Sequence, residues 1–260
     1  MRDPLAYLLL GIPLTAIFQL TVRRRPLAEL WIGDGRFRRP PATAWAVTTA
    51  VLAVVPLWTA GQALMQREWM SMAWASAACC GAAVGAGVVL QRRARSAPSC
   101  PGGWPRGIGA AIGAVSIGAA LFTLSALLTP ADRSLSPLGA LGVFIHSTLL
   151  YLPAVFVLEE VTFRGCLDAH LWRPGSASGR PARGRAVCTA VLSSWLWGLW
   201  HLPLVAGGST PWFVLIPYLV TVHTLMGIPL AVAWRRSGSL TLPAAAHAVI
   251  DGIRNAVLTT

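Results

Sequence analysis

Lysine is absent from this chain, and acidic residues are scarce. All 21 basic residues among the 260 are arginines, against nine Asp and Glu. Charged residues make up 12% of the chain, about half of what is usual in a soluble domain, whereas 55% of the residues are hydrophobic. The net charge of +12 would suit a nucleic-acid binder, but the arginines lie in short loops between apolar runs. We therefore expect no nucleic-acid partner.

The usual cysteine and zinc patterns are also missing. None of the five cysteines forms a Cys-x-x-Cys pair, and Cys79 and Cys80 lie inside an apolar run. Neither a zinc ribbon nor a disulfide framework is therefore indicated. The chain has no His-Glu-x-x-His, no internal repeat and no low-complexity segment.

Apolar runs, most of them about 20 residues long, dominate the chain and predict an all-α polytopic membrane helix bundle. We expect about eight transmembrane helices, each bounded by Pro, Gly or charge. The first run is short, but no small-x-small cleavage site follows it, so it reads as an anchor and not as a signal peptide. The predicted spans are Leu5 to Thr21, Ala42 to Met65, Met70 to Leu90, Gly107 to Thr129, Leu138 to Leu158, Ala186 to Val205, Trp212 to Trp234 and Leu240 to Leu258.

The arginines alternate between successive loops in the way that the positive-inside rule predicts. The loops after the first, third, fifth and seventh spans are rich in arginine, whereas the loops between them hold only Arg67 and Arg133. We expect a multi-pass protein of the cell (inner) membrane, with both termini extracytoplasmic. Residues 1–130 would form four spans without a recognisable motif, and residues 131–260 the four spans that carry the chemistry.

Two adjacent glutamates stand at the end of the fifth span, where charge is expensive to bury in a bilayer. On an α-helix Glu160 and Arg164 are four residues apart with the acid first, the favourable order for an ion pair, and Asp168 continues that row. Glu159 is offset by about 100° from the row and has no evident partner. We interpret Glu160 and Arg164 as structural support and Glu159 as the candidate base.

Two further blocks carry histidines. Trp197-x-x-x-His201 lies within Trp197-Gly-Leu-Trp-His-Leu-Pro203, and His247-x-x-x-Asp251 follows it. Together with Glu-Glu-x-x-Phe-Arg-Gly, and in the same order, these blocks resemble the CPBP family of intramembrane proteases, also called the CAAX-protease or Abi family. The family more often has Phe at the position of Trp197 and Asn at that of Asp251.

This resemblance covers residues 138–258 and implies a set of catalytic roles. Glu159 and His201 would activate water, and His247 and Asp251 would stabilise the oxyanion of the tetrahedral intermediate. Asp251 fits that role poorly. An Asn amide donates hydrogen bonds to an oxyanion, whereas the ionised carboxylate of an Asp repels it. Asp251 would have to be protonated, to orient the ring of His247, or to bind a metal.

A metal is therefore an open alternative. Two histidines and a carboxylate, here Glu159, His201 and His247, make a three-ligand set of the kind found in catalytic zinc sites. The spacing alone is weak evidence for zinc, because the two histidines lie on different predicted helices. Metal-free glutamate chemistry is the favoured prediction, and no other cofactor is indicated.

If every predicted span were a straight helix across the membrane, Glu159 and His201 would not meet. At about 1.5 Å per residue, Glu159 lies some 30 Å from the outer start of its span, whereas His201 lies roughly 20 Å into its own. We expect the sixth helix to begin near Arg185, below the membrane, so that the two side chains meet.

The sequence and this resemblance predict an intramembrane endopeptidase that cleaves a membrane-tethered or membrane-inserting peptide or protein near the interface of the lipid bilayer. The alternative is a non-catalytic membrane scaffold or bacteriocin-immunity-type protein of the same fold. A small transporter is disfavoured, because the polar residues cluster at one site and trace no path across the membrane. Neither the substrate nor the oligomeric state is indicated by the sequence.

Overall fold

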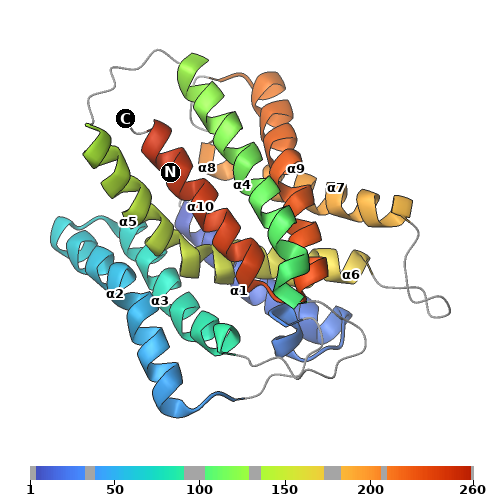
Figure 1. Ribbon diagram of the computed structural model, residues 1–260, viewed down its shortest axis with the longest axis horizontal. Helices are drawn as coiled ribbons and strands as arrows, with labels where there is room; N and C mark the ends of the chain where they lie inside the picture. The colour runs from blue at the N-terminus through green and yellow to red at the C-terminus, as the bar shows by residue number, and fades with distance from the viewer. Residues whose placement is uncertain are drawn as a thin grey trace.

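The structure is a computed structural model that describes residues 4–32, 39–90, 103–128, 136–172, 183–205 and 210–258. In these segments every regular element is a helix, apart from one isolated antiparallel bridge between Ile32 and Ser239. The predicted all-α fold is confirmed. The helices gather into one bundle, with α4, α9 and α10 running side by side through its upper part (Figure 1).

The helix boundaries lie mostly within a few residues of the predicted spans. The first half holds α1 (Pro4–Ile17), the π-helix η1 (Phe18–Val22), the 3-10 turn η2 (Leu27–Leu30), α2 (Ala42–Gln66), α3 (Trp69–Val89) and α4 (Gly103–Leu128). The second half holds α5 (Pro137–Val155), the π-helix η3 (Phe156–Asp168), α6 (Ala169–Leu171), α7 (Arg183–Trp200), α8 (Leu202–Val205), α9 (Trp212–Ser237) and α10 (Thr241–Leu258).

The expected count of eight transmembrane helices is not confirmed. Among the described residues, five helices are long and apolar enough to cross a membrane: α2, α3, most of α4, α5 and α9. The first run yields only a shorter apolar helix, Gly11–Val22. The helices α7 and α10 have 18 residues each but are not among the five. Both carry polar side chains, Ser193 and Ser194 on α7 and His247, Asp251 and Arg254 on α10, which make them less apolar than a simple span.

The segment that carries the two glutamates is not the α-helical end of a straight span. It is a 13-residue π-helix, η3, that continues directly from α5. Pro153 lies inside α5 three residues before η3 begins, and proline removes a backbone N–H and disturbs the α-helical ladder at that point. In Figure 1, η3 and α7 lie roughly horizontally, whereas α4 and α9 run steeply from top to bottom. The wider winding of a π-helix changes which side chains share a face, so the 100° offset expected for Glu159 does not hold.

The two halves of the chain share one hydrophobic core. Ala111, Ala114 and Phe122 of α4 are buried in the same cluster as Trp197 of α7 and Met226 of α9. A second cluster joins Leu30 of η2 to buried residues of α3, α5, η3, α9 and α10. The predicted division into residues 1–130 and 131–260 thus separates the part without motifs from the part with them. It does not correspond to two hydrophobic cores.

Glycines mark a close helix contact in one part of the bundle and open space in another. A Cβ at Gly81 of α3 would overlap the carbonyl group of Pro153, so α3 and α5 touch through their backbones there. A Cβ at Gly109 or Gly113 of α4 would meet nothing within 4 Å, so these two glycines mark no close contact.

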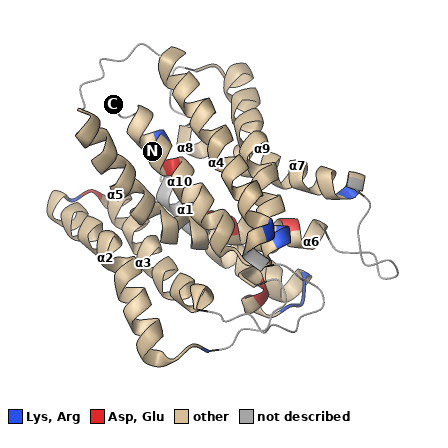
Figure 2. Cartoon of the chain, viewed as in Figure 1, with Lys and Arg blue, Asp and Glu red and all other residues tan. Residues whose placement is uncertain are grey.

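Among the described residues, charged side chains occupy only a few places on the bundle (Figure 2). Large hydrophobic side chains such as Trp58 and Phe213 are 65% and 80% exposed, as expected for surfaces that face lipid. Three charged side chains of η3, Glu160, Arg164 and Asp168, are almost fully buried. A charge buried in this way needs partners, and these partners define the site.

Candidate active site

Glu159 projects from η3 into the protein interior and is only 5% exposed. The indole Nε1–H of Trp197, on α7, donates a hydrogen bond of 2.6 Å to its Oε2 atom. Trp197 is 1% exposed, and the guanidinium of Arg164 lies 4.2 Å from the centre of its ring. The sequence analysis gave Trp197 no polar role, so this contact is new from the structure.

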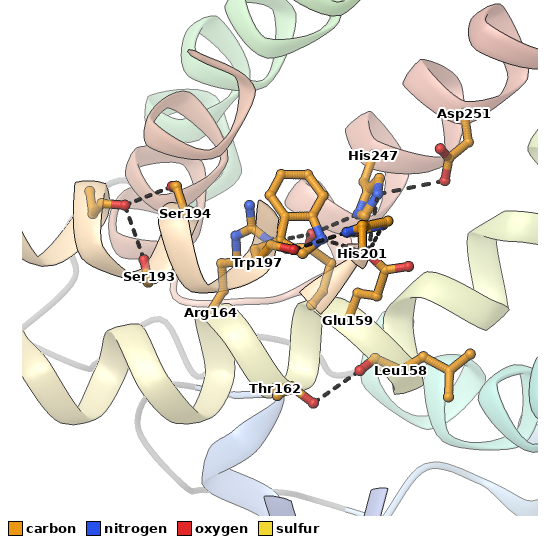
Figure 3. Close-up of polar contacts among 12 residues, drawn as sticks. Leu158, Glu159, Thr162, Arg164, Ser193, Ser194, Trp197, His201, His247 and Asp251 are labelled. Atoms are coloured by element: carbon orange, nitrogen blue, oxygen red, sulfur yellow. Dashed lines mark hydrogen bonds and ion pairs between the residues drawn. The ribbon is translucent and has the colours of Figure 1, made fainter. Parts of the chain in front are cut away.

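His201 lies just past the end of α7, and its ring faces Glu159 (Figure 3). Its Nδ1 atom is 2.9 Å from the carbonyl oxygen of Trp197. A carbonyl can only accept, so Nδ1 carries the proton and Nε2 of the neutral ring is the acceptor. Nε2 lies 3.7 Å from Glu159 Oε2.

His247 enters the site from α10 and is 4% exposed. Its Nδ1 atom donates to Glu160 Oε1 across 2.8 Å. Its Nε2 atom lies 3.8 Å from Glu159 Oε2 and 3.5 Å from Asp251 Oδ2. Both separations exceed a good hydrogen bond, so Nε2 faces two carboxylates without binding either one closely.

The structure thus brings together the side chains that the sequence analysis singled out. Glu159 from η3, His201 from the end of α7, and His247 and Asp251 from α10 surround a common point (Figure 3). They meet because η3 turns away from the direction of α5 and because α7 begins at Arg183, close to the predicted start at Arg185. Their convergence is observed, while their catalytic roles stay predictions.

Two further charged residues of η3, Glu160 and Arg164, lie beside these side chains. Their side chains are 0% and 1% exposed and form an ion pair with 3.1 Å between Nη1 and Oε1. The same Oε1 atom accepts the hydrogen bond from His247. Glu160 Oε2 and Arg164 Nη2 are buried and have no hydrogen-bond partner among the described residues. Glu160 thus contacts both His247 and Arg164, and the structural role of Glu160 and Arg164 stays a prediction.

Asp168 has a partner that the sequence did not reveal. Arg235 of α9 binds it with two nitrogens, Nε at 2.9 Å from Oδ2 and Nη2 on Oδ1. Arg235 also donates to the backbone oxygen of Ala186 and to Thr189 Oγ1, at 2.6 and 2.7 Å. One arginine thereby ties the end of η3 to both α7 and α9. The i, i+4 row from Glu160 through Arg164 to Asp168 suggested a local network, but this contact spans 67 residues.

Asp251 also has a cationic partner. Its Oδ1 atom lies 2.6 Å from Nη1 of Arg254, and its Oδ2 atom faces His247. An arginine does not lose its proton in proteins, so Arg254 places a positive charge beside one oxygen of this carboxylate. The three roles that the sequence left open for Asp251 stay predictions.

His223 of α9 is a further histidine beside the site. Its ring centre lies 4.4 Å from that of His201 and 4.5 Å from that of Trp197. Its Nδ1 atom bonds the carbonyl oxygen of Leu219 at 2.7 Å. His223 therefore packs directly against two residues of the site, His201 and Trp197.

Zinc is not supported by the donor arrangement. Among the described residues, no three or more His, Cys, Asp and Glu side chains are grouped so that they could hold a metal ion. In the trio considered for zinc, Glu159 Oε2 already accepts the Trp197 hydrogen bond. We derive no chemical step through a metal.

Residues 141–253 match the sequence model of the family described as type II CAAX prenyl endopeptidase Rce1-like. This segment begins in α5 and contains all four candidate catalytic residues. No curated protein and no solved structure matches the chain.

Proposed function

Over residues 141–253 this chain belongs to the Rce1-like family of CAAX-type membrane endopeptidases, and from that premise we propose that Glu159 and His201 activate the hydrolytic water. The observation that carries the proposal is the approach of Glu159 Oε2 to within 3.7 Å of His201 Nε2 and 3.8 Å of His247 Nε2. One water molecule beside these atoms would be within reach of all three groups, as general-base catalysis requires.

The base in this mechanism is Glu159. The Trp197 N–H holds Oε2 in place, and the buried setting excludes bulk water. His201 presents an unprotonated Nε2 to the same point, because its other nitrogen donates to the Trp197 carbonyl. Glu159 takes a proton from the water as the oxygen attacks the scissile carbonyl carbon. The protonated Glu159 then returns this proton to the leaving amine.

The oxyanion is assigned to His247. Glu160 accepts from Nδ1, so a doubly protonated ring would direct its Nε2–H towards the developing negative charge. The charges are consistent with this state. Arg164 offsets Glu160, Arg254 offsets Asp251, and a positive His247 would balance Glu159.

The substrate would be a peptide or protein held in or against the bilayer, since the surrounding helices expose apolar surface to lipid. Within that class we propose no particular sequence, lipid or cleavage position. Hydrolysis needs no cofactor in this scheme.

Replacement of Glu159 by Gln tests the proposal, because it removes the base while keeping the shape and the Trp197 contact. Cells that lack the native protein would carry the wild type, Glu159→Gln or Glu68→Gln, the last of these changing an exposed glutamate outside the site. Quantitative peptidomics of the membrane fraction should show a set of uncut peptides that accumulates with Glu159→Gln alone. Identical peptide profiles and identical growth for all three would contradict the proposal and point to a scaffold.

A further inference from the structure

Arg254 is a costly residue to place in α10. It is the fourteenth residue of the helix, about 20 Å from the first by helical rise. The side chain is 31% exposed, so about two-thirds of it is buried in the protein. A charged group buried to this extent needs partners.

Three neighbours fix the guanidinium. Nη1 binds Asp251 at 2.6 Å, Nε donates to Asn255 Oδ1 at 3.1 Å, and the group lies 5.6 Å from the ring centre of Tyr151. Asn255 is itself held by α5, because its Nδ2 donates to Ser147 Oγ at 3.1 Å. The orientation of Arg254 is thus set by two helices, α5 and α10.

The two oxygens of Asp251 divide between two cationic groups. Oδ1 binds Arg254, and Oδ2 faces Nε2 of His247 at 3.5 Å. Three carboxylates, those of Glu159, Glu160 and Asp251, face the ring of His247, and Arg254 offsets the charge of the third. An unbalanced carboxylate beside the developing oxyanion would repel it and slow the reaction.

We propose that Arg254 is a positioning residue that makes the carboxylate of Asp251 tolerable in the active site. It neutralises Asp251 and turns the other oxygen towards His247, so that the pair replaces the neutral side chain that an asparagine would provide. The inference rests on the proposed peptidase function. It assigns a role to a residue outside all three sequence blocks.

This pairing predicts that the need for Arg254 depends on residue 251. Asparagine has no charge to offset and brings its own N–H donor, so it should work without the arginine. An arginine that only stabilises the helix packing would be needed equally with either side chain. The effect of one substitution in the background of the other separates the two possibilities.

The experiment measures kcat and KM of the purified full-length protein in proteoliposomes, with a peptide that accumulates uncut in the Glu159→Gln cells. The variants are Asp251→Asn, Arg254→Gln, both together, and Arg236→Gln as an exposed arginine control. We expect Arg254→Gln to lower kcat about 10- to 100-fold with little change in KM when residue 251 is Asp. Whatever the rate of Asp251→Asn itself, adding Arg254→Gln to it should lower kcat by less than about threefold.

Two results would overturn the inference alone. One is an Arg254→Gln variant as active as the wild type. The other is a fall in kcat from Asp251→Asn to the double variant as large as the fall from the wild type to Arg254→Gln, which would assign Arg254 to packing. Thermal unfolding of each variant would show whether folding is lost. A wild-type protein that cleaves none of the accumulating peptides would instead overturn the proposed function, and the inference with it.

Discussion

The indole N–H of Trp197 donates to the carboxylate of Glu159 across 2.6 Å, from α7 to η3. The same indole ring touches the rings of His201, His223 and His247, with centre distances of 6.0, 4.5 and 4.9 Å. One buried side chain thereby contacts the proposed base and all the histidines around it. A phenylalanine at this position could fill much of the space, but it has no donor for the carboxylate.

Trp197→Phe should therefore impair chemistry more than folding. Loss of the N–H frees the Glu159 side chain to rotate, and small errors in the position of a general base are costly. We expect kcat to fall about tenfold with KM unchanged, the scale of a lost hydrogen bond to a charged group. Steady-state kinetics in proteoliposomes measures this effect.

Trp195→Phe is the matched control, because Trp195 lies on the same helix but is 47% exposed. Its kinetics should equal those of the wild type. Equal rates for the Trp197→Phe protein would show that Glu159 is held by other contacts.

Arg235→Ala should destabilise the fold, because it leaves Asp168 buried and charged without its partner. The two side chains are 8% and 0% exposed. Breaking such a pair costs about 3–5 kcal/mol. Thermal unfolding in detergent should show a large drop in Tm for Arg235→Ala and almost none for Arg236→Ala on the same turn. Equal Tm values for the two variants would mean that the Asp168 contact does not stabilise the protein.

Gly81→Ala should separate α3 from α5, since the new methyl group would overlap the Pro153 carbonyl. Overpacking of this kind costs about 1–3 kcal/mol. Gly109→Ala introduces the same methyl group into open space and should leave the unfolding temperature unchanged or higher. The comparison fails if both substitutions shift Tm by the same amount.

Chelators should leave the peptidase rate unchanged, because the proposed mechanism uses no metal. Prolonged incubation of the purified protein with 1,10-phenanthroline or EDTA, followed by the peptide assay, tests this expectation. A loss of activity that added zinc restores would bring back the ligand set of Glu159, His201 and His247.

The orientation in the membrane also stays a prediction. The arginine pattern places the loop around Ser178 in the cytoplasm and the loop around Ser209 outside, and both residues lie outside the part of the chain that the structure describes. Reporter fusions at the two positions should give opposite signals. An extracytoplasmic signal at Ser178 would reverse the predicted topology.

The sequence was most informative where chemistry depends on residue type. Glu159, His201 and His247 stood out because charge and imidazole are rare in apolar runs, and the structure brings them together. The partners Trp197, Arg235 and Arg254 were missed, since each makes its contact through folding that local spacing does not encode. The π-helix was missed as well, because its side-chain pattern resembles that of an α-helix over one or two turns.

The N-terminal segment lies directly against the helix that carries the proposed base. Nη1 of Arg23 donates to the Gly165 carbonyl at 3.0 Å, Thr15 bonds Thr162 at 2.9 Å, and a Cβ on Gly165 would overlap the Leu30 carbonyl. The half of the chain that contains the family match is consequently not an independent unit. In a chimaera that joins residues 131–260 to the N-terminal half of another membrane protein, η3 would lack these contacts. Such a chimaera should therefore keep the first 32 residues of this chain as well.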